Sequence, residues 1–561
     1  MNTSDTNAST GDTAPSAKHG SYRSGFAFGI LSFVAVAGVT LVSTVATSRI
    51  YGIRIIGQFA LVSAPVAALW VLSTAKEQAA LIKEITQLPT RHPRVTQLFS
   101  AVFTFSSTLT IVMSALGALV SWWVFRGPLH HPDLVTPTFV SLAGYALVTN
   151  TAWNVDSIFS AFVAGRQLFW VRLHEAVSFF VIAVAIGLGW RTIWGLVIAT
   201  IGSSVTGLIH RVIAVRPFVR LRLSLAEYRV GLRELPGLLR FGLKITPGSI
   251  AQGVSQQAGV WAIGAIAPVT VVGAYSRALT IPQRLQQVNV RIVEVLYPTL
   301  VGRRAKGDGH GFDRALIDSV RYGLVGMLLF AAVLGGAAHS LLLIFGPGFS
   351  DAAPALVLLL LFPALTSMTA TQTQALWAIG RPGLTSFISF ARLAVTIGLT
   401  VALTPRMGVT GPALALIVGY LVVVVWNTVS IHPTLARPIH ATWPLREQLA
   451  LVVAYATGYA GANVVEHAVP STPGLLLALL AGTLTYAAAF LVLGGLNERD
   501  RHRIGGAAVQ ARAWRERRKG SQDNAAVHGS PDVADRPDGS ATSHAGREGV
   551  NHLQIEVEAV E

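Results

Sequence analysis

The chain contains a long succession of apolar stretches, each of them long enough to cross a lipid bilayer as a helix. A span needs about 20 mostly apolar residues, because the hydrocarbon core is about 30 Å thick. Fourteen stretches meet this requirement, at 26–48, 56–75, 97–124, 136–163, 170–190, 192–214, 241–266, 269–298, 322–345, 352–379, 384–404, 408–430, 448–468 and 473–495. They are too long and uniform for barrel strands, which alternate over about ten residues. We therefore expect an all-α polytopic membrane protein with about 14 transmembrane helices.

Composition excludes several classes of protein. Charged residues make up only 12% of the chain and hydrophobic residues 52%, whereas soluble proteins carry about 25% charged residues. An ordinary soluble enzyme and a disordered protein are thereby excluded. The net charge of +16 is not concentrated on a charge-rich surface of the kind that binds nucleic acid, so no nucleic-acid partner is expected.

Candidate cofactor and metal motifs are weak or absent. The sequence lacks cysteine, which excludes thiolate metal sites and cysteine nucleophiles. It also lacks the GxxxxGK[ST] loop of an ATPase. His130, His131 and Asp133 lie together in a short loop, where chance explains them better than metal binding. We predict no cofactor, no metal site and no catalytic residues.

The distribution of basic residues predicts the orientation in the membrane, because loops rich in Lys and Arg stay in the cytoplasm. With residues 1–25 placed inside, 21 of the 31 Lys and Arg between residues 26 and 495 fall in or beside cytoplasmic loops, against five in outer loops. The cytoplasmic set includes Arg211 and Arg216, at the start of the longest such loop. An inner or plasma membrane protein with both termini in the cytoplasm is expected.

The spans divide into two halves and an addition. Both halves close with a short turn and a Gly-led span, at Gly189–Leu196 and at Pro405–Ala413, and Gly52–Ala60 at the start of the first half compares with Gly264–Ser276 in the second. Such a pseudo-repeat is typical of transporters. The expected regions are a disordered segment at 1–25, a six-helix lobe at 26–215, a linker at 216–240, a second six-helix lobe at 241–430, two additional helices at 431–495 and a disordered cytoplasmic tail at 496–561.

The 269–298 span carries a polar stripe. Its members are spaced so that all lie on one face of a helix, and they are Arg277, Thr280, Arg284, Gln287, Arg291 and Glu294. The fourteen residues between the end arginines extend about 21 Å at 1.5 Å per residue. Long side chains at one end of the span can extend their charged groups to the membrane surface, but those along the rest of the stripe cannot. The stripe is therefore expected to line a water-filled cavity and to bind an anion, the alternative being an amphipathic helix partly outside the membrane.

Other spans contribute polar residues that either line the same cavity or hold helices together. The candidates for binding cargo are Lys244, Gln256, Gln257 and Gln372, beside Arg277, Arg284, Gln287 and Arg291. Three acids inside spans, Asp156, Glu175 and Glu294, are candidates for coupling transport to protons, and helix packing is an equal alternative for them. Arginine pairs bidentately with phosphate, while amides and hydroxyls suit sugars.

These features resemble a known family. The two six-helix halves, the segment from Gly273 to Arg284 followed by Val295–Leu300, and Phe345–Pro354 look like the polysaccharide (lipid-linked oligosaccharide) flippase family. That family belongs to the multidrug/oligosaccharidyl-lipid/polysaccharide exporter superfamily. Members often carry an acid and a base in the middle of the seventh span, where this chain has Gln256 and Gln257.

The resemblance implies two lobes around a central cavity that opens alternately to each side. It implies a flippase that moves a lipid-linked oligosaccharide or polysaccharide precursor to the outer face, for cell-surface polysaccharide biosynthesis. The partners implied are a polyprenyl-diphosphate-linked glycan and membrane lipids, with polysaccharide assembly proteins as further candidates. Fourteen spans are also similar to the lipid II flippase branch, where two extra helices form a groove for the lipid tail.

Two other functions stay open at this point. A multidrug exporter of the same superfamily would share the fold, but the stripe is cationic and would repel cationic drugs. A membrane-embedded glycan polymerase or transferase would need a sizeable outer loop or acids in the first outer loop, and residues 49–55 contain no acid. We therefore expect a transporter and not an enzyme.

Overall fold

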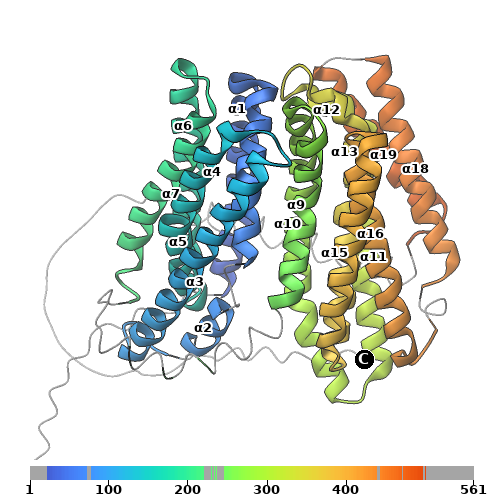
Figure 1. Ribbon diagram of the computed structural model, residues 1–561. Helices are drawn as coiled ribbons and strands as arrows, with labels where there is room; N and C mark the ends of the chain where they lie inside the picture. The colour runs from blue at the N-terminus through green and yellow to red at the C-terminus, as the bar shows by residue number, and fades with distance from the viewer. Residues whose placement is uncertain are drawn as a thin grey trace, which may run out of the picture. The chain divides into compact units, whose positions relative to one another are not determined.

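The computed structural model describes residues 22–72, 77–86, 88–219, 229, 233, 236, 246–438, 443–469, 472–496 and 500. Every regular element in these ranges is a helix, which confirms the all-α expectation (Figure 1). The described residues up to Gly495 form one compact unit. The N-terminal 21 residues, most of the 216–240 linker and the tail beyond residue 500 lie outside the described part.

The helices before residue 216 pack on one another and form what we call the first lobe, where α1 packs on α6, α6 on α7, α3 on α4 and α5 on α7. Its helices are α1 (Tyr22–Leu72), α2 (Glu77–Ile85), α3 (Pro93–Arg126), α4 (Val135–Gly144), α5 (Asn150–Ala161), α6 (Gly165–Gly189) and α7 (Ile193–Val215). A π-helical segment, Tyr145–Thr149, joins α4 to α5.

The helices from residue 246 to residue 431 form the second lobe, in which α9 packs on α15, α15 on α16, and α14 on α10, α11 and α16. Its helices are α9 (Thr246–Ile266), α10 (Val269–Ala305), α11 (Gly309–Gly336), α12 (Ala338–Leu343), α13 (Ala353–Leu359), α14 (Phe362–Ala378), α15 (Pro382–Met407) and α16 (Thr410–Ile431). Two further helices, α18 (Leu445–Ala468) and α19 (Thr472–Val492), pack on each other and on α11.

Two polar contacts and one ion pair hold α18 and α19 on the second lobe. The Glu447 carboxylate lies 3.0 Å from the Arg321 guanidinium, and the Glu466 carboxylate accepts a hydrogen bond from the backbone N–H of Ser340. The Tyr486 hydroxyl donates to the carbonyl of Val325. These three contacts join the additional helices to α11 and α12 at different positions along their length.

Contact between the lobes runs through α1, which packs on α9 and α10. Gly52 interrupts α1 with a left-handed backbone, φ +77°, which glycine adopts at little cost because it has no Cβ. A Cβ on Gly57 would collide with the carbonyl oxygen of Val269, and one on Gly273 would collide with that of Ile53. The two glycine segments compared in the sequence therefore face each other and bring α1 and α10 into backbone contact.

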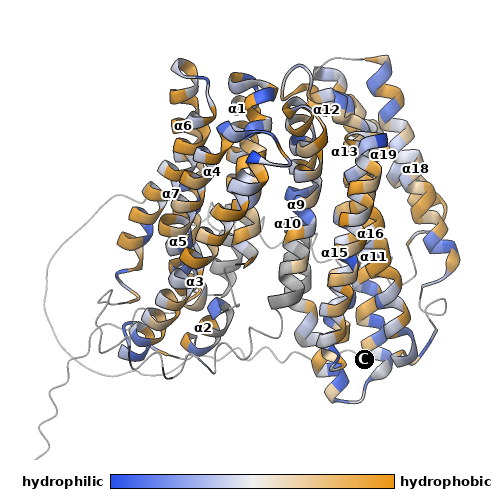
Figure 2. Ribbon diagram, viewed as in Figure 1, coloured by the Kyte–Doolittle hydropathy of each residue, from blue (hydrophilic) through white to orange (hydrophobic). Residues whose placement is uncertain are grey.

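The largest apolar cluster surrounds this junction and includes Tyr51, Ile56, Val272 and Tyr275. Hydrophobic residues occur along the length of the helices, as the orange in Figure 2 shows, and many of their side chains are exposed. Examples are Leu119, Val401 and Leu476, each at least 64% exposed. Such an exposed apolar surface is typical of a protein surrounded by lipid.

Ten helices of the described part are long and apolar enough to span a membrane, so the number fourteen is not established. One of them, Val34–Trp70, covers two predicted spans, because α1 consists of two helical segments that meet at a kink at Gly52. Three predicted spans are not among the ten. The span at 136–163 is divided among α4, the π-helical segment and α5, and the spans at 241–266 and 269–298 correspond to α9 and α10, which carry glutamines and arginines.

Candidate functional site

A cavity of about 800 Å³ lies where α10 of the second lobe faces α1, α5, α6 and α7 of the first. Its volume is in the range of small-molecule binding sites. Three sets of polar residues line it. They are the stripe on α10, hydroxyl-bearing residues on α1, and a cluster of charged residues on α5, α6 and α7.

The α10 wall consists of Arg277, Thr280, Gln283, Arg284 and Gln287. Four of these five belong to the stripe seen in the sequence, because a spacing of three, four or seven residues returns to the same face of a helix. The side chains of this wall become more exposed toward the C-terminal end of α10, from the half-buried Arg277 to the exposed Arg284 and Gln287. The cavity therefore widens toward the C-terminal end of α10.

Arg277 also joins the two lobes at the narrow end of the cavity. Its Nε donates a hydrogen bond of 2.8 Å to the Ser48 hydroxyl of α1. Arg49 makes a second contact between the lobes, because its Nε donates to the carbonyl of Ile344, which follows α12, at 2.8 Å. These bonds and the glycine contact close the cavity at the end where α10 begins.

The α1 wall carries the hydroxyls of Thr40, Ser43, Thr44 and Thr47. Their spacing of three or four residues puts them on one face of α1. Thr44 and Thr47 donate to the carbonyls of Thr40 and Ser43, each at 2.7 Å. Hydroxyl oxygens bonded in this way keep acceptor capacity toward the cavity.

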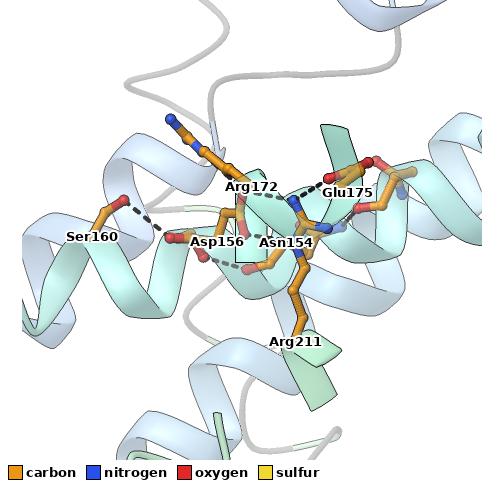
Figure 3. Close-up of polar contacts among 8 residues, drawn as sticks. Asn154, Asp156, Ser160, Arg172, Glu175 and Arg211 are labelled. Atoms are coloured by element: carbon orange, nitrogen blue, oxygen red, sulfur yellow. Dashed lines mark hydrogen bonds and ion pairs between the residues drawn. The ribbon is translucent and has the colours of Figure 1, made fainter. Parts of the chain in front are cut away.

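The charged cluster is built from three helices, as Figure 3 shows. Arg211 of α7 donates to Asp156 of α5, with Nε 2.7 Å from Oδ1. It also reaches Glu175 of α6, with Nη2 2.8 Å from Oε2. Arg172, one helical turn before Glu175, lies 3.8 Å from Asp156. Gly207 leaves room for the guanidinium, since a Cβ there would lie 2.9 Å from Nη1 of Arg211.

The pairing of Arg211 could not be predicted from the sequence. The sequence counts Arg211 among the basic residues in or beside a cytoplasmic loop, and in the structure it lies in α7 with a side chain only 4% exposed, held between two carboxylates. Positive charge is nevertheless in excess in the cavity, because four arginines and two carboxylates line it. No acid among the described residues forms an ion pair with Arg277 or Arg284.

The remaining predicted residues do not join this cavity in the described part of the chain. Gln256 and Gln257 are partly buried on α9 and are not in its lining. Gln372 is buried on α14 and donates to the Thr428 hydroxyl of α16 at 2.8 Å, a contact that joins two helices. Lys244 and the side chains of Arg291 and Glu294 lie outside the described residues.

Sequence reasoning missed the α1 hydroxyls, Arg172 and Arg211 as cavity residues. The spacing of Thr40, Ser43, Thr44 and Thr47 in the first span is a signal that could have found the hydroxyls. Among the described residues, no group of three or more His, Asp or Glu side chains is placed to hold a metal ion.

Comparison with protein families identifies the first half of the chain. Residues 23–302 match the family described as polysaccharide biosynthesis protein. This range includes the whole first lobe and the α10 wall of the cavity. No curated protein matches the chain by sequence.

Several solved structures share the fold. The lipid II flippase MurJ in its inward closed conformation is 12% identical and has a TM-score of 0.65, over 84% of this chain and 99% of the flippase. An inward-facing multidrug resistance transporter of the MATE family is 15% identical, with a TM-score of 0.53 over 72% of this chain and 94% of that one.

A third such structure is a transporter of the same superfamily from Pyrococcus furiosus, for which a reverse polarity of the binding pocket suggests a different function. It is 14% identical, with a TM-score of 0.53 over 74% of this chain and 97% of that one. The chain is a multi-pass membrane protein that belongs to the polysaccharide biosynthesis protein family and has the fold of the multidrug/oligosaccharidyl-lipid/polysaccharide exporter superfamily.

Proposed function

We propose that this protein is a flippase that moves a lipid-linked oligosaccharide or polysaccharide precursor from the cytoplasmic to the outer face of the membrane. The observation that carries the proposal is the cavity, in which arginines exceed carboxylates and Arg277 and Arg284 face the opposite lobe. The diphosphate of a polyprenyl-linked glycan is a ligand that such arginines bind bidentately. The family to which the chain belongs supports a role in cell-surface polysaccharide biosynthesis.

The two walls of the cavity bind different parts of such a headgroup. Arg277 and Arg284 on α10 bind the phosphates, and the α1 hydroxyls together with Gln283 and Gln287 bind sugar hydroxyls. Arg291 extends the same face of the helix by one further repeat and is proposed to receive the headgroup first. The lipid chain stays in the bilayer, because apolar chains gain nothing from a polar cavity.

The direction of opening supports alternating access. The cavity widens toward the C-terminal end of α10, which is the cytoplasmic end in the orientation predicted from the basic residues. It is closed at the opposite end by the contacts of α1 with α10 and of Arg49 with Ile344. Rocking of the lobes about α1 would break these contacts and expose the headgroup outside.

Purified full-length protein in proteoliposomes tests the function directly. We expect it to translocate a fluorescent polyprenyl-diphosphate-linked oligosaccharide and not to accumulate an organic cation such as ethidium. Cation uptake without movement of the lipid-linked glycan would instead indicate a multidrug exporter. Lengthening of the glycan during the assay would indicate a polymerase. Empty liposomes, treated in the same way, give the spontaneous rate.

The glycine contact between the lobes provides a prediction about closure. Gly57→Ala or Gly273→Ala places a Cβ against the backbone of the other lobe, so we expect either change to separate the lobes at this end. The native chain has no cysteine, and a single Thr47→Cys therefore reports on the buried side of the cavity. Labelling of this cysteine by an impermeant maleimide added outside cells should rise several-fold.

Gly38→Ala is the matched control for that experiment. Gly38 lies on the same helix and has no atom within 4 Å of the added Cβ, so labelling should equal that of Thr47→Cys alone. Unchanged labelling in both Gly57→Ala and Gly273→Ala would show that this contact does not close the cavity.

A further inference from the structure

We propose that the second lobe binds a small inorganic anion of the size of chloride between α15 and α16, beside Arg392. This site is separate from the cavity between the lobes, whose lining does not include Arg392. The inference rests on a buried guanidinium that has no carboxylate partner among the residues that the structure describes.

Arg392 lies in the middle of α15 and is only 4% exposed. Its Nε and Nη2 atoms are buried without a hydrogen-bond partner among the residues that the structure describes. A guanidinium stays protonated even when buried, so its charge must be compensated rather than removed. Burying an uncompensated ion in a protein is strongly unfavourable.

The sequence of the surrounding helices excludes compensation by a carboxylate on them. The helices that pack on α15 are α9, α14 and α16. These three, and α15 itself, contain no Asp or Glu. The guanidinium carbon lies 4.5 Å from the centre of the Tyr420 ring, but a cation–π contact is weaker than a charge-assisted hydrogen bond to an anion. That contact alone is too weak to offset the burial of the charge.

Hydroxyl groups gather on the same side of α15. Thr396 and Thr400 follow Arg392 at intervals of four residues, and their hydroxyls are buried without a partner in the described part of the chain. The Tyr420 hydroxyl is also buried and unpartnered. A Cβ on Gly419 of α16 would collide with Oγ1 of Thr396 and lie 3.3 Å from Cγ of Arg392. Arg392 and Thr396 therefore face the same point of α16.

This set of groups favours an anion over a cation or a neutral molecule. Guanidinium N–H groups can only donate, and hydroxyls donate readily, so the site offers donors and one full positive charge. A single buried charge matches a monovalent ion. The phosphate-linked cargo, by contrast, needs an open route and more than one cation, both of which the cavity between the lobes supplies.

Dependence of stability on chloride tests the proposal, because a ligand that binds only the folded state stabilises it in proportion to its occupancy. We expect the thermal unfolding midpoint of the full-length protein in detergent to rise by a few degrees when gluconate is replaced by chloride at constant ionic strength. Arg392→Gln should abolish this rise. Thr396→Val keeps the charge and removes one donor, so it should reduce the rise even if Arg392→Gln does not fold.

Arg277→Gln is the control that separates this site from the cavity, and it should retain the chloride-dependent rise. Crystals or particles prepared in bromide should show the heavier ion in contact with Arg392. The proposal is overturned if the midpoint does not depend on chloride. It is equally overturned if Thr396→Val keeps the full rise. Absence of bromide beside Arg392 would also overturn it, and would be expected if an acid from another part of the chain pairs with Arg392.

Discussion

Replacing Arg277 and Arg284 together with glutamine is expected to reduce translocation of a lipid-linked oligosaccharide by at least a hundredfold while the protein still folds. A hydrogen bond to a charged group contributes about 1.5–3 kcal/mol, and each 1.4 kcal/mol changes affinity about tenfold. Losing two such anchors for one diphosphate therefore removes most of the binding. Glutamine keeps polar contact with the cavity, so the change tests charge more than shape. The measurement is the rate of glycan appearance at the outer leaflet of proteoliposomes.

The control for this double variant removes the same charge from elsewhere. Arg191 and Arg406 are exposed and do not line the cavity, so Arg191→Gln with Arg406→Gln should leave the rate unchanged. Arg277 also bonds Ser48, and Arg284→Gln alone separates loss of cargo binding from loss of lobe contact. If the double variant transports normally with an unchanged unfolding midpoint, the α10 stripe does not bind the cargo.

The α10 wall could be predicted from sequence because it depends on a single helix. A spacing of seven residues is about two turns, so Arg277 and Arg284 must share a face wherever the helix lies. Their low hydropathy also explains why α10 is not among the ten helices that qualify as spans on apolarity. The feature that indicates a function is thus the one that weakens the span signal.

The charged cluster could not be predicted because it depends on how three helices pack. Asp156 and Arg211 are 55 residues apart, and nothing near Arg211 in sequence distinguishes it from the loop arginines that follow. Gln372, which is predicted to bind cargo, illustrates a second ambiguity. A polar residue inside a span either lines a cavity or joins helices, and its bond to Thr428 is of the second kind. Only the packing of α14 against α16 decides between the two.

The similarity of the two glycine segments could be seen in the sequence, but their contact could not be predicted from it. Comparing Gly52–Ala60 with Gly264–Ser276 indicated two related halves, and the contacts of Gly57 and Gly273 show that these segments face each other. Such a contact is expected if a pseudo-twofold axis relates the two halves. Because neither glycine has a Cβ, the lobes can approach to backbone contact at this point.

Arg211→Met is expected to destabilise the protein by about 3–5 kcal/mol, because removing one partner of a buried ion pair leaves the other charge uncompensated. Here two carboxylates lose their shared partner, and the Asp156 side chain is only 8% exposed. Unfolding in detergent, followed by fluorescence or calorimetry, should show a lower midpoint. The control is the triple variant Arg211→Met, Asp156→Asn and Glu175→Gln, which removes the whole buried charge set and should recover most of the loss.

Glu175→Gln alone decides whether this cluster also couples transport to protons. The Glu175 side chain is 27% exposed, against 8% for Asp156, so it is the more accessible of the two carboxylates that line the cavity. Asp156 still holds Arg211 in this variant, and the cost in stability should stay well below that of Arg211→Met. If Glu175 carries the proton, flux driven by a pH gradient should fall to the rate without a gradient, in a protein that unfolds at nearly the native midpoint. Retention of gradient-driven flux would leave Asp156 and Glu175 a structural role, in which they hold α5, α6 and α7 around Arg211 as one wall of the cavity.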